Sequence, residues 1–216
     1  QTLKSTVAQA RAVGRPFDPA CNSKLESLFA ELKANPLVEL KDHGRAKDHF
    51  RNKAFFEAYF SNYIEGTRFG IEEAEEIVFE SKIPKKRPQD AHDVLGTYQL
   101  ISDPNEIRKC PRSFDEFLDL IRSRHAKLMA ERPEARPGGF KERPNRAGNT
   151  HFVAPELIEG TFEKGFQKYR ELPAGLARAI YMMFLVAEVH PFNDGNGRVG
   201  RIMMNAELQA CGLVSI

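Results

Sequence analysis

The chain has few cysteines, and none of them is placed for a disulfide framework or a metal site. Its three cysteines are Cys21, Cys110 and Cys211, which lie far apart and form no CxxC pair. This usage is typical of proteins from a reducing compartment. We therefore interpret the three side chains as packing residues.

Long apolar runs are also missing. The longest, residues 179–187, is well short of the roughly 18 residues that a membrane-spanning helix needs. The N-terminus shows no charged segment followed by an apolar stretch, as a signal peptide would. We expect a cytoplasmic protein with no membrane partner. Because the chain starts at Gln1 and stops soon after Gly212, we also expect a longer parent protein.

The chain lacks a large excess of either charge. Its 32 basic and 30 acidic residues leave a formal net charge of +2, so no bulk field favours nucleic acid as a direct partner. The 216 residues, 41% hydrophobic and 29% charged, are ordinary for a soluble globular protein of one large domain or two small ones. Partners must therefore be inferred from a specific site.

Apolar residues recur at helical spacing along most of the chain, which predicts an all-α or mainly α protein. We expect caps at Asn22 and Ser23, and a capping box formed by Ser113 and Glu116. We interpret the basic residues between Pro84 and Pro88 as a solvated linker rather than a nucleic-acid patch. The expected helices cover residues 22–33, 46–65, 72–79, 91–101, 113–130, 172–189 and 198–210, with another starting near residue 155.

Residues 190–201, HPFNDGNGRVGR, join two of these helices through a loop of glycine, polar and charged residues. Pro191 disfavours helical geometry at His190, so the imidazole should lie at a helix C-terminus facing the loop. Without a Cβ, Gly195 and Gly197 allow consecutive N–H groups to curl into a nest at the start of the next helix. The pattern predicts a phosphate cradle beside a base.

The charged side chains of the same loop suit a polyphosphate and a divalent ion. Arg198 and Arg201 lie three residues apart on the first turn of the helix, where both can reach an anion. Asp194 is the only carboxylate of the loop, and an ion that bridges phosphates usually takes one or two such oxygens plus water, which predicts Mg²⁺. Asn196 offers a donor and an acceptor, and Phe192 is interpreted as a buried structural anchor.

This segment resembles the signature of the Fic family, HxFx(D/E)GNGRxxR, and matches it at every specified position. The resemblance implies a helical bundle with a small β-hairpin flap near the active site. It also implies a protein adenylyltransferase that moves AMP from ATP to a Ser, Thr or Tyr hydroxyl of a target protein, or of itself. By the resemblance, His190 is the general base, Asp194 holds Mg²⁺, and the phosphates are held by Gly195, Asn196, Gly197, Arg198 and Arg201.

A second motif, SNYIEG at residues 61–66, places a carboxylate where a helix should end. On position alone, Glu65 is most simply a solvated side chain and Gly66 a C-cap, with Ser61 on the same helical face. The motif is similar, however, to the inhibitory (S/T)xxxE(G/N) of Fic proteins whose inhibitory helix is N-terminal. That likeness implies that Glu65 pairs with Arg201, so that ATP binds with its α-phosphate misplaced for attack.

The segment between residues 132 and 155 is rich in Pro and Gly and predicts a long functional loop or a small hairpin. Its PGGF at residues 137–140 is similar to the flap of relatives, with Lys141 or Arg143 where relatives often carry Arg. We expect residues 150–153 to form a strand that pairs with a target peptide. We expect two regions, an inhibitory N-terminal one (1–90) and a Fic catalytic core (91–216) truncated at its C-terminus.

Several alternatives accompany this interpretation. The glycines of the loop also spell GxGxxG, but that dinucleotide fingerprint needs a preceding strand and a later acidic residue. Within the Fic fold, Gly197 favours adenylylation over phosphorylation, while removal of AMP or transfer of UMP, GMP or phosphocholine stays open, as does a homo-oligomer. From another class, the chain could be a non-catalytic nucleotide-binding regulatory module.

Overall fold

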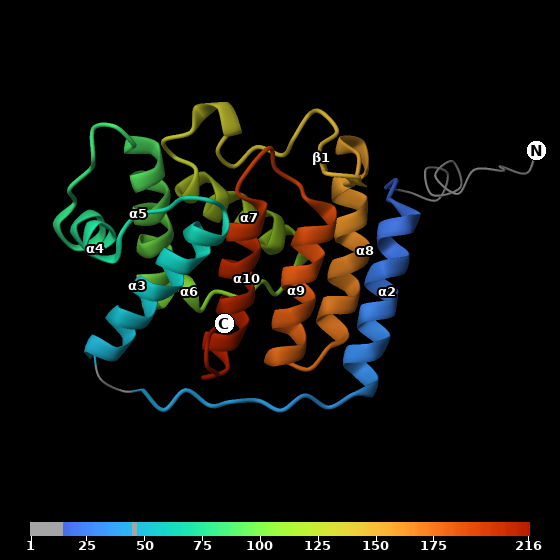
Figure 1. Ribbon diagram of the computed structural model, residues 1–216. Coiled ribbons are helices and arrows are strands. Elements are labelled where there is room, and N and C mark those ends of the chain that lie inside the picture. The colour runs from blue at the N-terminus through green and yellow to red at the C-terminus, as the bar shows by residue number, and fades with distance from the viewer. Residues whose placement is uncertain (1–14, 45–46) are drawn as a thin grey trace, which may run out of the picture.

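The computed structural model describes residues 15–44 and 47–216, and this part is mainly α-helical with one small two-stranded sheet (Figure 1). This confirms the expected fold class. The α-helices are α2 (Pro19–Ala34), α3 (Lys47–Ile64), α4 (Ile71–Glu80), α5 (Pro88–Ser102), α6 (Pro104–Ile107), α7 (Phe114–Leu128), α8 (Ile158–Glu171), α9 (Leu176–Val189) and α10 (Asn196–Ala210). Two short 3₁₀ helices, η1 (Pro133–Ala135) and η2 (Pro155–Leu157), flank the hairpin of β1 (Arg146–Ala147) and β2 (Thr150–His151).

Helix α9 lies at the centre of the bundle, between α10 on one side and α8 and α2 on the other (Figure 1). Its buried side chains face several neighbours and include Tyr181, Leu185, Val186 and Val189. A helix that is apolar around most of its circumference must be covered on most sides, which explains its central place. The helix therefore holds His190, the residue that caps its C-terminus, on a rigid support.

A second apolar cluster joins α3, α4 and α5. It contains Phe55 of α3, Ile77 of α4 and Val94 of α5, all nearly inaccessible to solvent. This packing places the end of α3, which carries the SNYIEG motif, beside the start of α10 (Figure 1). The division of the chain at residue 90 remains a prediction.

Helix ends differ from expectation where a local cap is stronger than the assumed one. Helix α2 begins at Pro19 because the Asp18 side chain accepts hydrogen bonds from two backbone N–H groups; the caps expected at Asn22 and Ser23 were wrong. Helix α9 starts at Leu176 instead of residue 172, since Pro173 and Gly175, whose φ is +111°, interrupt the helix. The expected start at residue 46 lies outside the described residues.

The capping box at the start of α7 is confirmed in part. Ser113 is the N-cap, and its Oγ accepts from the Glu116 N–H at 3.1 Å. The Glu116 carboxylate accepts from the N–H of Arg112, one residue before the position that a reciprocal box would use. Helix α6 was not expected, because its four residues are too few to show a periodic pattern.

The flap is a hairpin as expected, but its second strand is shorter. Ala147 pairs with Thr150 and Arg146 with His151, one further backbone bond runs from the Phe152 N–H to the Asn145 carbonyl at 3.3 Å, and Val153 is buried. In Figure 1 the hairpin lies at the same end of the bundle as the α9–α10 loop. Within the described residues, no helix is both long and apolar enough to cross a membrane.

Candidate active site

His190 caps α9 in a left-handed backbone conformation, with φ 52° and ψ 60°. Its N–H still donates to the Val186 carbonyl at 2.9 Å, so the helix ends at this residue as expected. Pro191 explains the departure from helical geometry, although the residue before a proline more often becomes extended. A left-handed conformation is costly for a residue with a side chain, and such strain tends to occur at functional sites.

The His190 ring is half-buried and held on two sides. It stacks on Phe152 with ring centroids 3.7 Å apart, and it lies against the Ala187 backbone. Burial lowers the pKa of His190, and the nearby Lys141 ammonium lowers it further. A lowered pKa favours the neutral imidazole, which is the state that a general base requires at neutral pH.

The flap fixes the backbone of the same turn. Lys141 donates from its N–H to the Pro191 carbonyl at 2.8 Å and from Nζ to the His190 carbonyl at 2.7 Å. Asn145 accepts from Lys141 Nζ and donates to the Phe192 carbonyl at 3.0 Å. Burial of Lys141 lowers its pKa to about 8. Three consecutive carbonyls of the loop are therefore bound by the segment that the sequence identified as a flap.

The loop then turns into α10 through Gly195, which has φ +76°. The Asp194 carboxylate accepts from the Gly195 N–H at 2.6 Å. The Asn196 amide is buried, with Nδ2 donating to the Phe192 carbonyl and Oδ1 accepting from the Phe192 N–H. Both polar atoms of the Asn196 side chain therefore bond the loop backbone at Phe192, and phosphate binding by Asn196 stays a prediction. Phe192 is fully buried, as expected of an anchor.

Glu65 reaches this loop from the end of α3. Its carboxylate bonds Arg201 Nη2 at 2.6 Å, while Ser61 accepts from the same guanidinium through Oγ at 2.8 Å and through its carbonyl at 2.9 Å. A Cβ added to Gly197 would overlap the Glu65 carboxylate, so this anion lies directly on the first turn of α10. The start of a helix favours negative charge, and Glu65 occupies that place.

The helix carrying the motif ends at Ile64, one residue earlier than expected. Glu65 and Gly66 form the following turn, in which the Gly66 N–H donates to the Tyr63 carbonyl at 3.1 Å and φ of Gly66 is +93°. Ser61 and Glu65 still reach the same guanidinium, as their four-residue spacing suggested.

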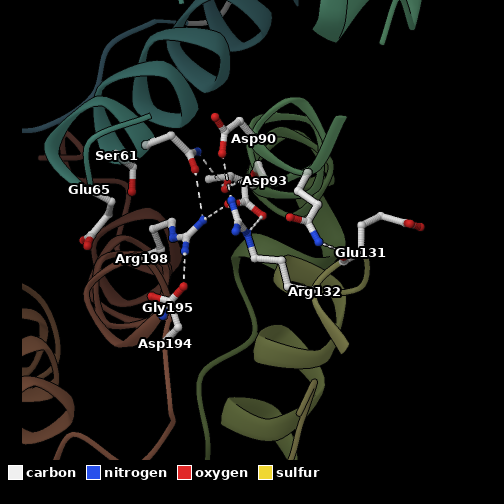
Figure 2. Close-up of polar contacts among 12 residues, drawn as sticks. Ser61, Glu65, Asp90, Asp93, Glu131, Arg132, Asp194, Gly195 and Arg198 are labelled. Carbon is white, nitrogen blue, oxygen red and sulfur yellow. Dashed lines mark hydrogen bonds and ion pairs between the residues drawn. The ribbon is translucent and has the colours of Figure 1, made fainter. Parts of the chain in front are cut away.

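Arg198 lies in a different environment from Arg201. Its side chain is 3% exposed, and its guanidinium bonds Asp93 at 2.7 Å and faces Asp194 at 3.6 Å, as Figure 2 shows. Asn62 of α3 accepts from it at 3.3 Å. Asp93 also receives two hydrogen bonds from Arg132 Nε, at 2.9 and 3.1 Å (Figure 2). The structure gives Arg198 a buried carboxylate partner, and phosphate binding by this residue stays a prediction.

Sequence analysis did not identify the roles of Asp93, Asn62 and Arg132, because the partner of each residue is distant from it in the sequence. The available signal was the charge of Asp93 in the middle of α5, next to the buried Ala91 and Val94. A carboxylate on the apolar face of a helix requires a buried partner, but the sequence does not say which.

His125 of α7 was also missed. It is fully buried and stacks on Phe192 with centroids 3.6 Å apart and the rings nearly parallel. Its Nδ1 accepts from the Gly138 N–H at 2.9 Å, and its Nε2 lies 3.0 Å from the Asp194 carbonyl. Burial lowers the pKa of His125 to about 4, so the ring is neutral and donates through Nε2.

The side chains present fit a nucleoside triphosphate with its metal ion. Glu65 is a carboxylate standing on a helix start whose glycine leaves room for an anion. Within the described ranges, no group of three His, Cys, Asp or Glu could hold a metal. The Asp194 side chain is 55% exposed and is the one carboxylate of the loop. A Mg²⁺ that is held by one carboxylate and by substrate phosphates matches this arrangement.

Residues 113–208 match the model of the Fic/DOC family. A Fido domain-containing protein of Dictyostelium discoideum is 38% identical over 80 residues, which is 35% of this chain and 56% of that protein. The protein adenylyltransferase Fic of Nematostella vectensis is 27% identical over 174 residues, or 74% of this chain and 40% of that protein. The chain thus spans about half or less of the length of these relatives.

The fold is similar to that of solved Fic proteins. A fragment of Fic-1 from C. elegans has a TM-score of 0.58 and 19% identity, covering 96% of this chain and 60% of that fragment. At this identity the likeness supports the fold alone. The family match covers the segment that contains the whole 190–201 loop, so this part of the chain is similar in sequence to Fic/DOC proteins.

Proposed function

We propose that this chain is a protein adenylyltransferase, which transfers AMP from ATP to a hydroxyl side chain of a protein and is held in an inhibited state by Glu65. The observation that carries the proposal is the position of the Glu65 carboxylate, bound to Arg201 above Gly197 and close to the loop of His190. The adenylyltransferase names of related proteins support the same reaction.

The proposed reaction uses the two halves of the loop for different steps. His190 takes the proton of the target hydroxyl, whose oxygen then attacks the α-phosphorus of ATP and releases pyrophosphate. A positioned base of this kind contributes about 10²–10⁴ in rate. The N–H groups at the start of α10 and the Arg201 guanidinium would hold the phosphates, and Asp194 would hold Mg²⁺, which supplies positive charge to them.

Inhibition follows from competition for one guanidinium. While Arg201 bonds Glu65 and Ser61, its Nε and Nη2 donors are engaged and are not free for the outermost phosphate. The Glu65 side chain is 31% exposed, so solvent screens the pair and its strength is less than that of a fully buried one. Couplings between such sites are typically 1–3 kcal/mol, or about 5–150-fold.

The first prediction concerns Glu65. We expect Glu65→Gly to increase self-labelling by radioactive ATP about 5–150-fold, because Arg201 becomes free for phosphate. Intact-mass spectrometry with ATP, UTP and GTP would identify the donated nucleotide. Glu131→Gly is the matched control, since Glu131 is exposed and follows α7 outside the site. Equal labelling of wild type and Glu65→Gly would refute the inhibitory role.

The second prediction concerns His190. In the Glu65→Gly background, we expect His190→Ala to reduce labelling at least about 10²-fold, because the hydroxyl loses its base. Calorimetric titration with Mg·ATP should show nearly unchanged binding, since the phosphate contacts lie at α10. If both variants label equally, His190 is not the base. An absence of metal-dependent nucleotide binding in both would favour the non-catalytic module instead.

Removal of AMP is the second outcome that these experiments resolve. A Glu65 that orients water would make the wild type, and not Glu65→Gly, release AMP from a labelled protein. We expect the opposite balance, because the Glu65 carboxylate is engaged by Arg201. Incubating the purified labelled Glu65→Gly protein with the wild type would measure the release directly.

A further inference from the structure

Helix α7 packs against both the flap and the α9–α10 loop, and one of its side chains, His125, contacts both. His125 accepts from the Gly138 N–H at 2.9 Å on the flap side and bonds the Asp194 carbonyl at 3.0 Å on the loop side. Its ring stacks on Phe192 with the ring centroids 3.6 Å apart. Both hydrogen-bonding atoms of this ring are therefore used, and both partners are backbone groups of the proposed site.

Each of these contacts ends at a backbone corner that needs glycine. Gly138 has φ +78°, and a Cβ there would lie 3.2 Å from Ala126 of α7. Gly195 follows Asp194 with φ +76°, and a Cβ there would lie 2.9 Å from the sulfur of Met129 and 3.5 Å from His125. The two corners therefore approach one face of α7 closely, with His125 between them.

We propose that His125 is a positioning residue that holds the flap and the metal-binding loop in register, through two hydrogen bonds that act on different steps of the reaction. This rests on the proposed function. The bond to the Asp194 carbonyl sets the direction of the carboxylate that would hold Mg²⁺. The bond from Gly138 sets the start of the flap, which leads through Lys141 to the His190 carbonyl.

The two bonds are separable because two amide side chains each reproduce one ring nitrogen. The Oδ1 of Asn can take the place of Nδ1 and accept from Gly138, whereas the Nδ2 is too short to reach Asp194. The Nε2 of Gln can take the place of the ring Nε2 and donate to Asp194, whereas its stem offers no acceptor to Gly138. Both substitutions remove the stacking on Phe192 equally.

The experiment compares His125→Asn and His125→Gln in the Glu65→Gly background. We expect His125→Asn to raise the Mg²⁺ concentration for half-maximal self-labelling about 10-fold, as is typical when a residue that orients a metal ligand is lost. Its Gly138 amide should exchange with deuterium as in the parent. We expect His125→Gln to keep the parental Mg²⁺ dependence and to exchange Gly138 about 10-fold faster, since the amide loses its acceptor.

The outcomes distinguish this inference from the proposed function. If the Glu65→Gly parent does not label, the proposed function fails before His125 is tested. If the parent labels and the two variants change both quantities alike, or change neither, His125 only fills space and the inference is overturned. Thermal melting of both variants shows that they are folded.

A measurement on the unsubstituted protein covers the case in which a variant does not fold. The proposed contacts need Nε2 to carry the hydrogen and Nδ1 to be bare. NMR of protein with isotope-labelled histidine nitrogens would identify this tautomer for His125 at neutral pH. The opposite tautomer would overturn the inference, because it cannot accept from Gly138.

Discussion

Arg198 and Arg201 lie one turn apart on α10, yet the protein surrounds them differently. Arg198 is buried against Asp93, which Arg132 also bonds, whereas Arg201 is held by Glu65 and Ser61 near the surface. A buried ion pair is costly to break, whereas a partly exposed pair can exchange with solvent or a ligand at lower cost. The comparison assigns a permanent structural partner to Arg198 and an exchangeable one to Arg201.

The largest effect should come from the buried pair. We expect Asp93→Asn to lower the free energy of unfolding by about 3–5 kcal/mol, because Arg198 and Arg132 are left without their shared carboxylate. Glu65→Gly should lower it by less than about 1 kcal/mol. Urea denaturation of the two variants would measure this difference. Equal losses of unfolding free energy would show that the Asp93–Arg198 and Glu65–Arg201 pairs contribute alike to stability.

The Glu65 carboxylate that binds Arg201 also influences the protonation of His190. Its pKa is lowered mainly by burial, whereas the charges of Glu65 and Asp194 raise it and Lys141 lowers it. Histidine has an ordinary pKa of about 6.5. Because the pKa of His190 in the folded protein is lower, the neutral base persists below that pH and is lost only as the pH falls through the pKa of the folded protein. The contribution of His190 to folding stability follows the same pH dependence. It is fully present above the ordinary histidine pKa and is lost as the pH falls through the lower pKa of the folded state.

Removing Glu65 takes away an influence that raises the His190 pKa. We therefore expect the His190 ring of Glu65→Gly to titrate at a lower pH than that of the wild type, which NMR of the ring protons would follow. The acid limb of labelling should fall about tenfold per pH unit below that pKa. Glu131→Gly should leave the His190 titration unchanged, and a shift to higher pH in Glu65→Gly would contradict the assignment.

The sequence predicted the parts of the site that are contiguous. Residues 190–201 contain the base, the glycines and both arginines, and four-residue spacing was enough to bring Ser61 and Glu65 to one cation. Mainly helical structure followed from periodic apolar residues such as those of α9. These features depend on local geometry, which spacing determines.

What the sequence did not reveal depends on contacts between distant helices. The helical pattern of α7 and α5 is complete without His125 and Asp93. The role of His125 comes from packing of α7 against the α9–α10 loop, and that of Asp93 from packing of α5 against α10. The same limit explains Asn196. Its side chain matched a phosphate ligand by chemistry, but the fold of the loop turns it toward Phe192.

The smallest effect tests the second partner of Arg201. Ser61→Ala removes the hydrogen bond to Arg201 Nε at 2.8 Å but keeps the bond to the Ser61 carbonyl and the pair with Glu65. One such bond is worth about 1 kcal/mol, so we expect labelling by otherwise wild-type protein to rise about fivefold at most, and by less than in Glu65→Gly measured under the same conditions.

Ser27→Ala is the matched control for Ser61→Ala, because Ser27 is exposed on α2 and bonds its own helix backbone at Ser23. If Ser61→Ala activates as strongly as Glu65→Gly, the hydroxyl and not the carboxylate holds Arg201 in place. If it has no effect, Arg201 is held by Glu65 and the Ser61 carbonyl alone. In that case the exchangeable partner of Arg201 is a single charge, and its sensitivity to salt should be correspondingly greater.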